Sequence, residues 1–130
     1  MTKLDRDLAI ADNLEYVRRA LESIGHRNVV VFAGFSQGVA MAYRAAAAMP
    51  CAGLIALAGD VPPDVRDRAA ALPPVLLGRG IADEWYSEEK MRGDLAILKE
   101  ATPVTFDGGH EWTDEFRTAA GIFLSRLSAV

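Results

Sequence analysis

The sequence predicts an α/β fold: a three-layer, doubly wound and mostly parallel sheet of about four strands. Short apolar, β-branched runs alternate along the chain with longer segments in which apolar residues recur at helical spacing. The runs do not alternate polar with apolar residues, which is typical of strands that helices bury on both faces. With 130 residues, of which 51% are hydrophobic and 25% charged, the chain is long enough for a single domain, residues 1–130, with one core.

The first half of the chain begins with an amphipathic helix that Gly25 ends. Its apolar residues recur at intervals of three and four: Leu4, Leu8, Ala11, Leu14, Val17, Leu21 and Ile24. A buried strand is expected at residues 28–35, followed by a helix at residues 37–49 that Pro50 stops. A second buried strand is expected at residues 53–58.

The second half continues the alternation of strands and helices. The elements expected are a loop at 60–64, a short helix at most at 65–72, a strand at 74–78, a helix at 87–100, a short strand at 104–106 and a last helix at 113–127. Because parallel strands need crossover connections, this order favours a sheet that is covered by helices on both faces.

Composition excludes several kinds of partner. The net charge is −4 and the fourteen basic residues are scattered, whereas nucleic-acid and anionic-membrane surfaces need clustered Lys and Arg. The single cysteine, Cys51, cannot form an internal disulfide or a cysteine-based zinc cluster. Residues 1–6 are charged and no apolar run reaches membrane-spanning length, so we expect a cytoplasmic protein without an export signal or anchor.

A Gly-x-Ser-x-Gly motif joins the first buried strand to the helix after it. It consists of Gly34, Phe35, Ser36, Gln37 and Gly38. Between a strand and a helix, the motif indicates a nucleophile elbow, a strained turn that lifts the Ser36 hydroxyl clear of the sheet. Gly34 and Gly38 give room for close backbone approach, and the Gln37 N–H is placed to donate to a developing oxyanion. A glycine-rich turn with a solvated serine is the alternative.

A serine hydroxyl needs a base to take its proton, and the base needs a carboxylate to orient it. In open parallel sheets function gathers at the carboxyl ends of the strands, and Ser36, Asp60, Asp83 and His110 each follow a strand. Of the two histidines, His26 precedes the elbow strand, at the opposite end of the sheet, so His110 is the expected base. Asp83 is favoured over Asp60 as the orienting acid because it leaves the later strand.

Four aromatic residues lie beside these candidates in the sequence: Phe35, Trp85, Tyr86 and Trp112. They are candidates for the walls of an acyl pocket, and ordinary core packing is the alternative. The neighbouring charges Glu84 and Asp107 are interpreted as solvated or structural.

Three segments carry a resemblance to a known family. They are Gly-Phe-Ser-Gln-Gly followed by Val-Ala-Met-Ala, then Asp-Glu-Trp-Tyr, and then Phe-Asp-Gly-Gly-His-Glu-Trp. These segments resemble the phospholipase/carboxylesterase branch of the α/β-hydrolases and are similar to acyl-protein thioesterases. The resemblance runs from the first helix to the end of the chain. It implies Ser36 as nucleophile, Asp83 as acid and His110 as base, with Gln37 supplying one oxyanion amide and with no metal or organic cofactor.

The start of the chain departs from that family. Members that resemble it begin with further strands and a His-Gly loop that supplies the second oxyanion amide, and no His-Gly pair occurs here. The chain is therefore similar to the C-terminal portion of such a hydrolase. We expect a serine hydrolase that acts on small carboxylic esters or thioesters through an acyl-enzyme. The alternatives are a non-catalytic subunit and a small-molecule binding module.

The elbow strand is expected to lie at an edge of the sheet, because the strands that flank it in the family have no counterpart in this chain. Residues 29–32 would then form an apolar, unpaired edge without Pro or Lys to block pairing. Exposed edges of this kind pair with other strands. We therefore expect a homodimer joined through the elbow-strand edge.

Overall fold

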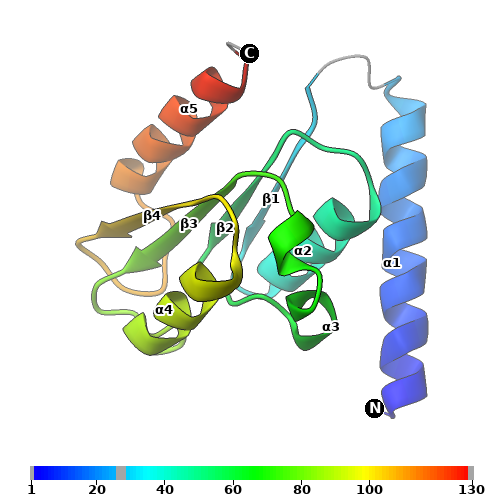
Figure 1. The fold of residues 1–130 in the computed structure, drawn as a ribbon, viewed down its shortest axis with the longest axis horizontal. Coiled ribbons are helices and arrows are strands. Elements are labelled where there is room, and N and C mark those ends of the chain that lie inside the picture. The colour runs from blue at the N-terminus through cyan, green and yellow to red at the C-terminus, as the bar shows by residue number, and fades with distance from the viewer. Residues whose placement is uncertain (1, 26–28, 129–130) are drawn as a thin grey trace.

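The computed structural model describes residues 2–25 and 29–128 and contains one parallel sheet (Figure 1). Its strands are β1 (Val31–Phe35), β2 (Gly53–Leu57), β3 (Val75–Gly80) and β4 (Ala101–Phe106). They lie in the spatial order β1-β2-β3-β4, with every neighbouring pair parallel. The predicted α/β class and the predicted parallel sheet are therefore confirmed.

The helices are α1 (Lys3–Ser23), α2 (Gln37–Ala48), α3 (Pro63–Arg66), the 3-10 turn η1 (Ala69–Ala71), α4 (Glu88–Ile97) and α5 (Asp114–Ser128). Figure 1 shows α5 on one face of the sheet and α2, α3 and α4 on the other. The crossover helices thus cover one face and α5, which follows β4, covers the other, so the fold has the three layers that the alternating sequence predicts.

Each strand divides its apolar side chains between two cores. In β2, Leu54 and Ala56 join a cluster with side chains of α2, α3 and α4. Ile55 and Leu57, which point the other way, pack with Phe116 and other residues of α5. Because successive side chains of a strand face opposite sides, a strand covered on both faces reads as a continuous apolar run.

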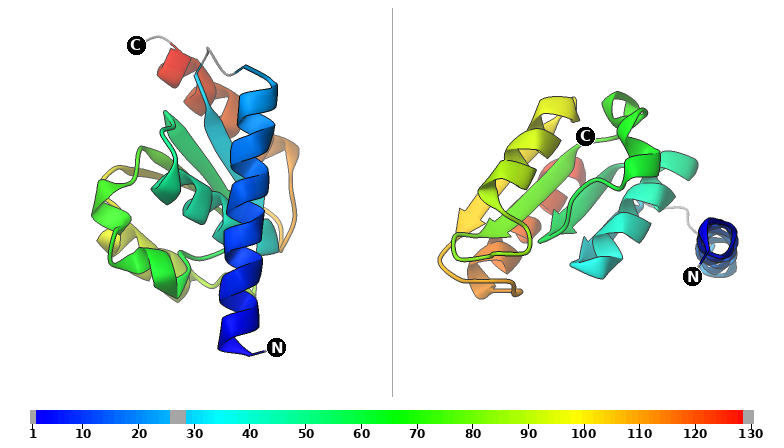
Figure 2. Two further views of the ribbon diagram at one scale, coloured as in Figure 1. Left: turned by 90° about the vertical axis from the view of Figure 1, so that its right-hand side faces the viewer. Right: turned by 90° about the horizontal axis from the view of Figure 1, so that it is seen from below.

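Helix α1 is long and lies at the outside of the molecule, alongside α2 (Figure 2). Thr2 and Asp5 form a capping box at its start. None of its residues is fully buried, and Leu4, Leu8 and Ile24 of the predicted apolar stripe are exposed. The spacing predicted the helix, but only part of the stripe is covered, because α1 packs beside α2 rather than over the sheet.

Several element boundaries differ from those that the sequence predicts. Strand β4 begins at Ala101 rather than at residue 104, and it contains Pro103. Proline removes a backbone donor, and it is tolerated here because β4 lies at the edge of the sheet. Strand β3 extends to Gly80, and the segment 65–72 divides into the end of α3 and the turn η1.

Within residues 2–25 and 29–128, each helix is too short or too polar to span a bilayer. 

Candidate active site

Ser36 sits on a strained turn between β1 and α2. Its φ of 56° and ψ of −116° are unfavourable for a residue with a side chain, at a cost of roughly 1–3 kcal/mol. The turn is held by a hydrogen bond from the Ser36 N–H to the Leu57 carbonyl at 2.9 Å. A Cβ at Gly34 would lie 2.4 Å from the Gly38 carbonyl oxygen, so the backbone closes tightly only because residue 34 is glycine.

The sequence predicts that Gly38, like Gly34, is needed for close backbone approach, and the structure shows open space where its side chain would be. A Cβ built at Gly38 meets no atom of the described residues within 4 Å. The close approach is therefore made by the backbone of Gly38 toward Gly34, and the side-chain space at residue 38 is open. Sterics within the described residues require a glycine at the first motif position and not at the last.

Three predicted residues form a hydrogen-bonded row, which we call the active-site row: Ser36, His110 and Asp83. Ser36 Oγ lies 2.7 Å from His110 Nε2, and His110 Nδ1 lies 2.9 Å from Asp83 Oδ2. Because an ionised carboxylate can only accept, Nδ1 carries the proton and Nε2 is left as an acceptor for the serine hydroxyl. The structure thus brings together residues from the ends of β1, β3 and β4.

Asp83 is 2% exposed, and backbone amides hold its second oxygen. Oδ1 accepts the N–H of Trp85 at 2.8 Å and the N–H of Tyr86 at 3.0 Å. Burial alone would raise the pKa of this carboxyl, but the bonds from Tyr86, His110 and Trp85 outweigh burial and hold the pKa below its ordinary value. The carboxylate is therefore ionised at neutral pH and oriented toward the imidazole.

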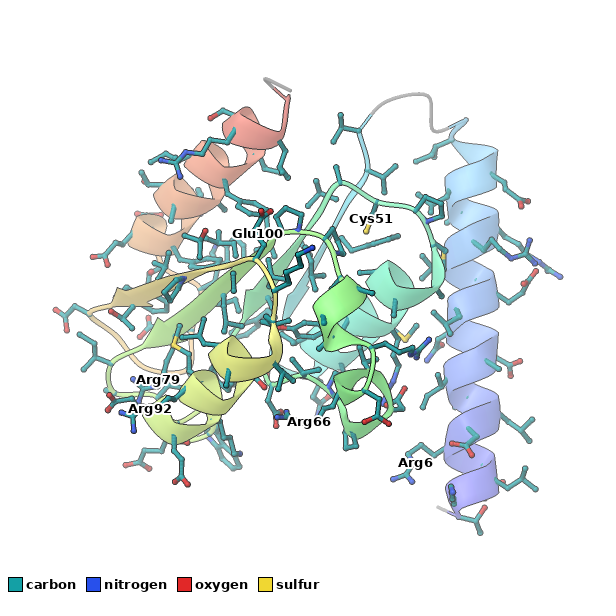
Figure 3. The ribbon with its side chains drawn as sticks, in the orientation of Figure 1. Arg6, Cys51, Arg66, Arg79, Arg92 and Glu100 are labelled. Carbon is teal, nitrogen blue, oxygen red and sulfur yellow. The ribbon has the colours of Figure 1, made fainter. Side chains whose placement is uncertain are left out.

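Arg79 stabilises the loop that carries Asp83 by hydrogen bonds to its backbone. Its guanidinium donates to the carbonyl oxygens of Tyr86 at 2.8 Å, Ile81 at 3.2 Å and Asp83 at 3.3 Å. Figure 3 shows Arg79 at the end of β3, beside α4. The planar guanidinium offers several donors in fixed directions, so one side chain fixes both ends of this loop.

The loop that carries His110 packs backbone to backbone against the Asp83 loop. The N–H of Ala82 donates to the Gly108 carbonyl at 2.9 Å. A Cβ at Gly80 would lie 2.2 Å from the Gly109 carbonyl oxygen, so residue 80 has to be glycine for the two loops to meet. Sequence reasoning did not identify Gly80, because its role depends on a neighbour in space.

A cavity of about 260 Å³ opens beside Ser36. It is lined by Ser36, Gln37, Ala58, Gly59, Asp60, Trp85, Tyr86 and His110. Asp60, the alternative acid, lies in this wall and is exposed, whereas the bond from the imidazole goes to Asp83. Among the described residues, no group accepts a hydrogen bond from the Gln37 amide, the first N–H of α2.

The predicted aromatic residues differ in how they lie relative to the site. The Phe35 ring lies 5.3 Å from the His110 ring and the Trp85 ring 6.5 Å from it, centroid to centroid. Tyr86 lines the cavity and is 1% exposed. Trp112 does not line the cavity, since its ring packs edge-on against Phe116 of α5 at 5.2 Å.

Other predicted charges lie apart from the row. Glu84 and Asp107 are exposed, and His26 lies outside the described residues. Within the described ranges, no group of three or more His, Cys, Asp or Glu side chains is placed to hold a metal ion. The groups that the structure places side by side at the site are the Ser36 hydroxyl and the oriented His110 imidazole.

The fold agrees with the comparisons with known proteins. The sequence profile of the alpha/beta hydrolase family matches residues 3–129, and the chain belongs to that family. No curated protein matches the chain in sequence.

The solved structures whose fold is similar to that of this chain include a thioesterase, a carboxylesterase and a predicted hydrolase. Acyl-protein thioesterase 2 of Zea mays has a TM-score of 0.73 at 16% identity, covering 91% of this chain and 64% of its own. The carboxylesterase of Bacillus cereus has a TM-score of 0.77 at 18% identity, covering 98% and 64%. A predicted CIB-like hydrolase of Thermoplasma acidophilum has a TM-score of 0.76 at 22% identity, covering 88% and 59%. The chain thus spans about three fifths of their length.

Proposed function

We propose that this chain is a serine hydrolase that acts on small carboxylic esters or thioesters through an acyl-enzyme. The observation that carries the proposal is the active-site row, in which an oriented imidazole lies 2.7 Å from the Ser36 hydroxyl. Membership of the alpha/beta hydrolase family supports hydrolysis as the reaction class. An imidazole held in this way is what converts a weak hydroxyl nucleophile into a reactive one.

In the proposed reaction, Ser36 Oγ bonds to the carbonyl carbon of the ester and gives its proton to His110 Nε2. The carbonyl π electrons move to oxygen, and the Gln37 N–H donates to that oxyanion. When the carbonyl re-forms, the C–O or C–S bond of the ester breaks and the leaving group takes the proton from Nε2. Water then attacks the acyl carbon and gives a proton to His110 Nε2. The bond from that carbon to Ser36 Oγ breaks, Oγ takes the proton from Nε2 and the acid leaves, while Asp83 keeps the imidazole oriented throughout.

The size of the cavity supports a small acyl group. Its volume of about 260 Å³ lies below the range of roughly 300–1,000 Å³ that is typical of pockets for drug-sized ligands. Ala58 and the rings of Trp85 and Tyr86 supply apolar surface beside the nucleophile. Esters with short acyl chains fit beside Ser36 and are the substrates for the first assay.

Gln37 is the one oxyanion donor that we assign among the described residues. Loss of one such donor costs ~10²–10³ in rate in hydrolases that have two, and the remaining machinery still accelerates the reaction over water. We therefore expect slow but measurable turnover of activated esters.

Turnover of p-nitrophenyl acetate and of a short acyl thioester tests the proposal. Hydrolysis by the folded protein, lost in Ser36→Ala, is the expected result. Absence of turnover in a folded protein would contradict the proposal and favour the alternatives, a non-catalytic subunit or a binding module. Thermal unfolding of both proteins provides the control for folding.

We also propose a cytoplasmic location, which cysteine usage supports. The chain has one cysteine, Cys51, so it forms no internal disulfide, as is usual in a reducing compartment. Burial raises the pKa of the half-buried Cys51 thiol, which keeps it protonated and poorly reactive. Fractionation of cells that express the tagged protein tests the location.

A further inference from the structure

A second buried carboxylate, Asp94, lies on α4 outside the active-site row. It is 1% exposed, and its oxygens accept bonds from three donors. Oδ2 accepts the Tyr86 hydroxyl at 2.7 Å. Oδ1 accepts Arg66 Nη1 at 3.2 Å and the Val61 N–H at 3.4 Å. A buried carboxylate is tolerated only when such donors surround it, so its position is closely determined.

Asp94 accepts hydrogen bonds from three different segments around the site. Val61 follows β2 in the chain, and Arg66 ends α3 on the side that faces α4 (Figure 3). Tyr86 belongs to the loop that follows β3 and carries Asp83. Removing the carboxylate would therefore release contacts between α4 and two loops at the carboxyl end of the sheet.

Tyr86 connects Asp94 with the active-site row. Its hydroxyl donates to Asp94, and its backbone N–H donates to Asp83 Oδ1 at 3.0 Å. The Tyr86 side chain is 1% exposed and belongs to the core cluster that also contains Met91 of α4. Burial, together with Asp94, raises the pKa of the Tyr86 phenol, so the hydroxyl remains a donor at every pH used for an assay.

We propose that Asp94 is a positioning residue that acts through Tyr86 to hold the Asp83 carboxylate against His110. This inference rests on the proposed function. The hydrogen bond from the Tyr86 hydroxyl to Asp94 fixes the position of the Tyr86 ring. The fixed ring holds in place the Tyr86 backbone N–H, whose hydrogen bond Asp83 accepts. Asp83 in turn holds the His110 proton on Nδ1, which leaves Nε2 free for the serine. Asp94 has no contact with substrate in this scheme.

Tyr43 provides a matched control for this test. It is a second tyrosine without solvent exposure, on α2, in the same core cluster as Tyr86. Its hydroxyl is buried and makes no hydrogen bond within the described residues. Tyr43→Phe and Tyr86→Phe therefore delete the same atom from similar surroundings, and only the second deletion breaks a bond to Asp94.

The first measurement is the rate of p-nitrophenyl acetate hydrolysis by the full chain. We expect Tyr86→Phe to lower kcat by up to ~100-fold with little change in KM, because small misplacements of catalytic groups have costs of that size. Tyr43→Phe should match the wild type. Asp94→Asn should resemble Tyr86→Phe, and the double variant should lose no more than the worse single one, since both act through one bond.

The second measurement is nitrogen NMR of the His110 ring, assigned by comparison with His110→Ala. We expect the Nδ1–H form in the wild type and in Tyr43→Phe, and a mixture of both neutral forms in Tyr86→Phe. If Tyr86→Phe keeps both the wild-type kcat and the wild-type ring signals, the positioning role is wrong. If no protein turns over ester, the proposed function fails, and the ring signals still decide the role of Asp94.

Discussion

Ser36 Oγ and His110 Nε2 lie 2.7 Å apart, although 74 positions separate the two residues in the sequence. Ser36 follows β1 and His110 follows β4, and these strands are the opposite edges of the sheet. With neighbouring strands about 4.8 Å apart, the His110 loop has to cross roughly 14 Å of sheet edge to reach the serine. Its backbone contact with Gly80 supports it on the way.

Removal of either partner in this pair should have the same effect. We expect Ser36→Ala and His110→Ala each to reduce p-nitrophenyl acetate hydrolysis to near background, because the two groups act as a unit. The double variant should be no slower than either single variant. A steady-state assay of the three proteins, each first checked for folding, tests this, and additive losses would show that the residues act independently.

The two candidate acids should differ strongly. Asp83→Asn should lower kcat by up to ~10⁴-fold, because the amide stabilises the wrong imidazole tautomer. Asp60→Asn should change kcat little, since Asp60 lies in the cavity wall without the bond to the imidazole. The assay compares both variants with the wild type under the same conditions. A large loss in Asp60→Asn with a small loss in Asp83→Asn would reverse the assignment.

Stability should depend on acid pH through Asp83, whose pKa is lower in the folded protein than its ordinary value. The ionised Asp83 carboxylate therefore contributes stability at pH values above its pKa in the unfolded chain, about 3.9. This contribution is lost as the pH falls through the lower pKa that Asp83 has in the folded protein. The stability difference between wild type and Asp83→Asn should therefore shrink from about pH 5 to below about pH 3. Urea unfolding at several pH values measures it, and a constant difference would contradict the lowered pKa.

The outer edge of β1 is the surface through which we propose that two copies associate. Val30 O and the Ser36 N–H point toward β2, so the backbone groups of Val31, Ala33 and Phe35 point outward. Among the described residues, no strand pairs with this edge. An unblocked edge favours strand pairing across a two-fold axis.

Sedimentation at micromolar concentration tests this association. We expect a dimer that Ala33→Pro disrupts, because proline at that position removes an outward-pointing donor. Thr105→Pro on the opposite edge strand, β4, where the N–H also points away from the sheet, provides the control. A monomeric wild type at all concentrations would refute pairing through β1.

The sequence predicts those features that depend on neighbours along the chain. The strand, the Gly-x-Ser-x-Gly motif and the helix after it are contiguous, so Ser36 can be placed without coordinates. Asp83 and His110 each follow a strand. Because functional residues of open parallel sheets lie at the carboxyl ends of the strands, the sequence predicts that both lie at that end of the sheet. For Trp112 the sequence leaves pocket wall and packing as alternatives, because the contact of its ring with Phe116 depends on the position of α5.

Features that depend on contacts across the fold could not be predicted from the sequence. Gly80 is required by the backbone of a loop that lies more than two dozen residues away in the chain. Asp94 looks like an ordinary helix charge in the sequence, and only the packing of α4 brings it to the Tyr86 hydroxyl. The exposed part of α1 was also unpredictable, since the spacing of apolar residues does not say how much of a stripe a neighbour covers.

Covalent labelling by a fluorophosphonate tests the central claim most directly, because the probe reacts with an activated serine. The account predicts one adduct per chain by intact mass, located on Ser36 by peptide mapping. The adduct should be absent in Ser36→Ala and should form far more slowly in His110→Ala. A folded wild-type protein that stays unlabelled, or that carries the label on another residue, would contradict the account.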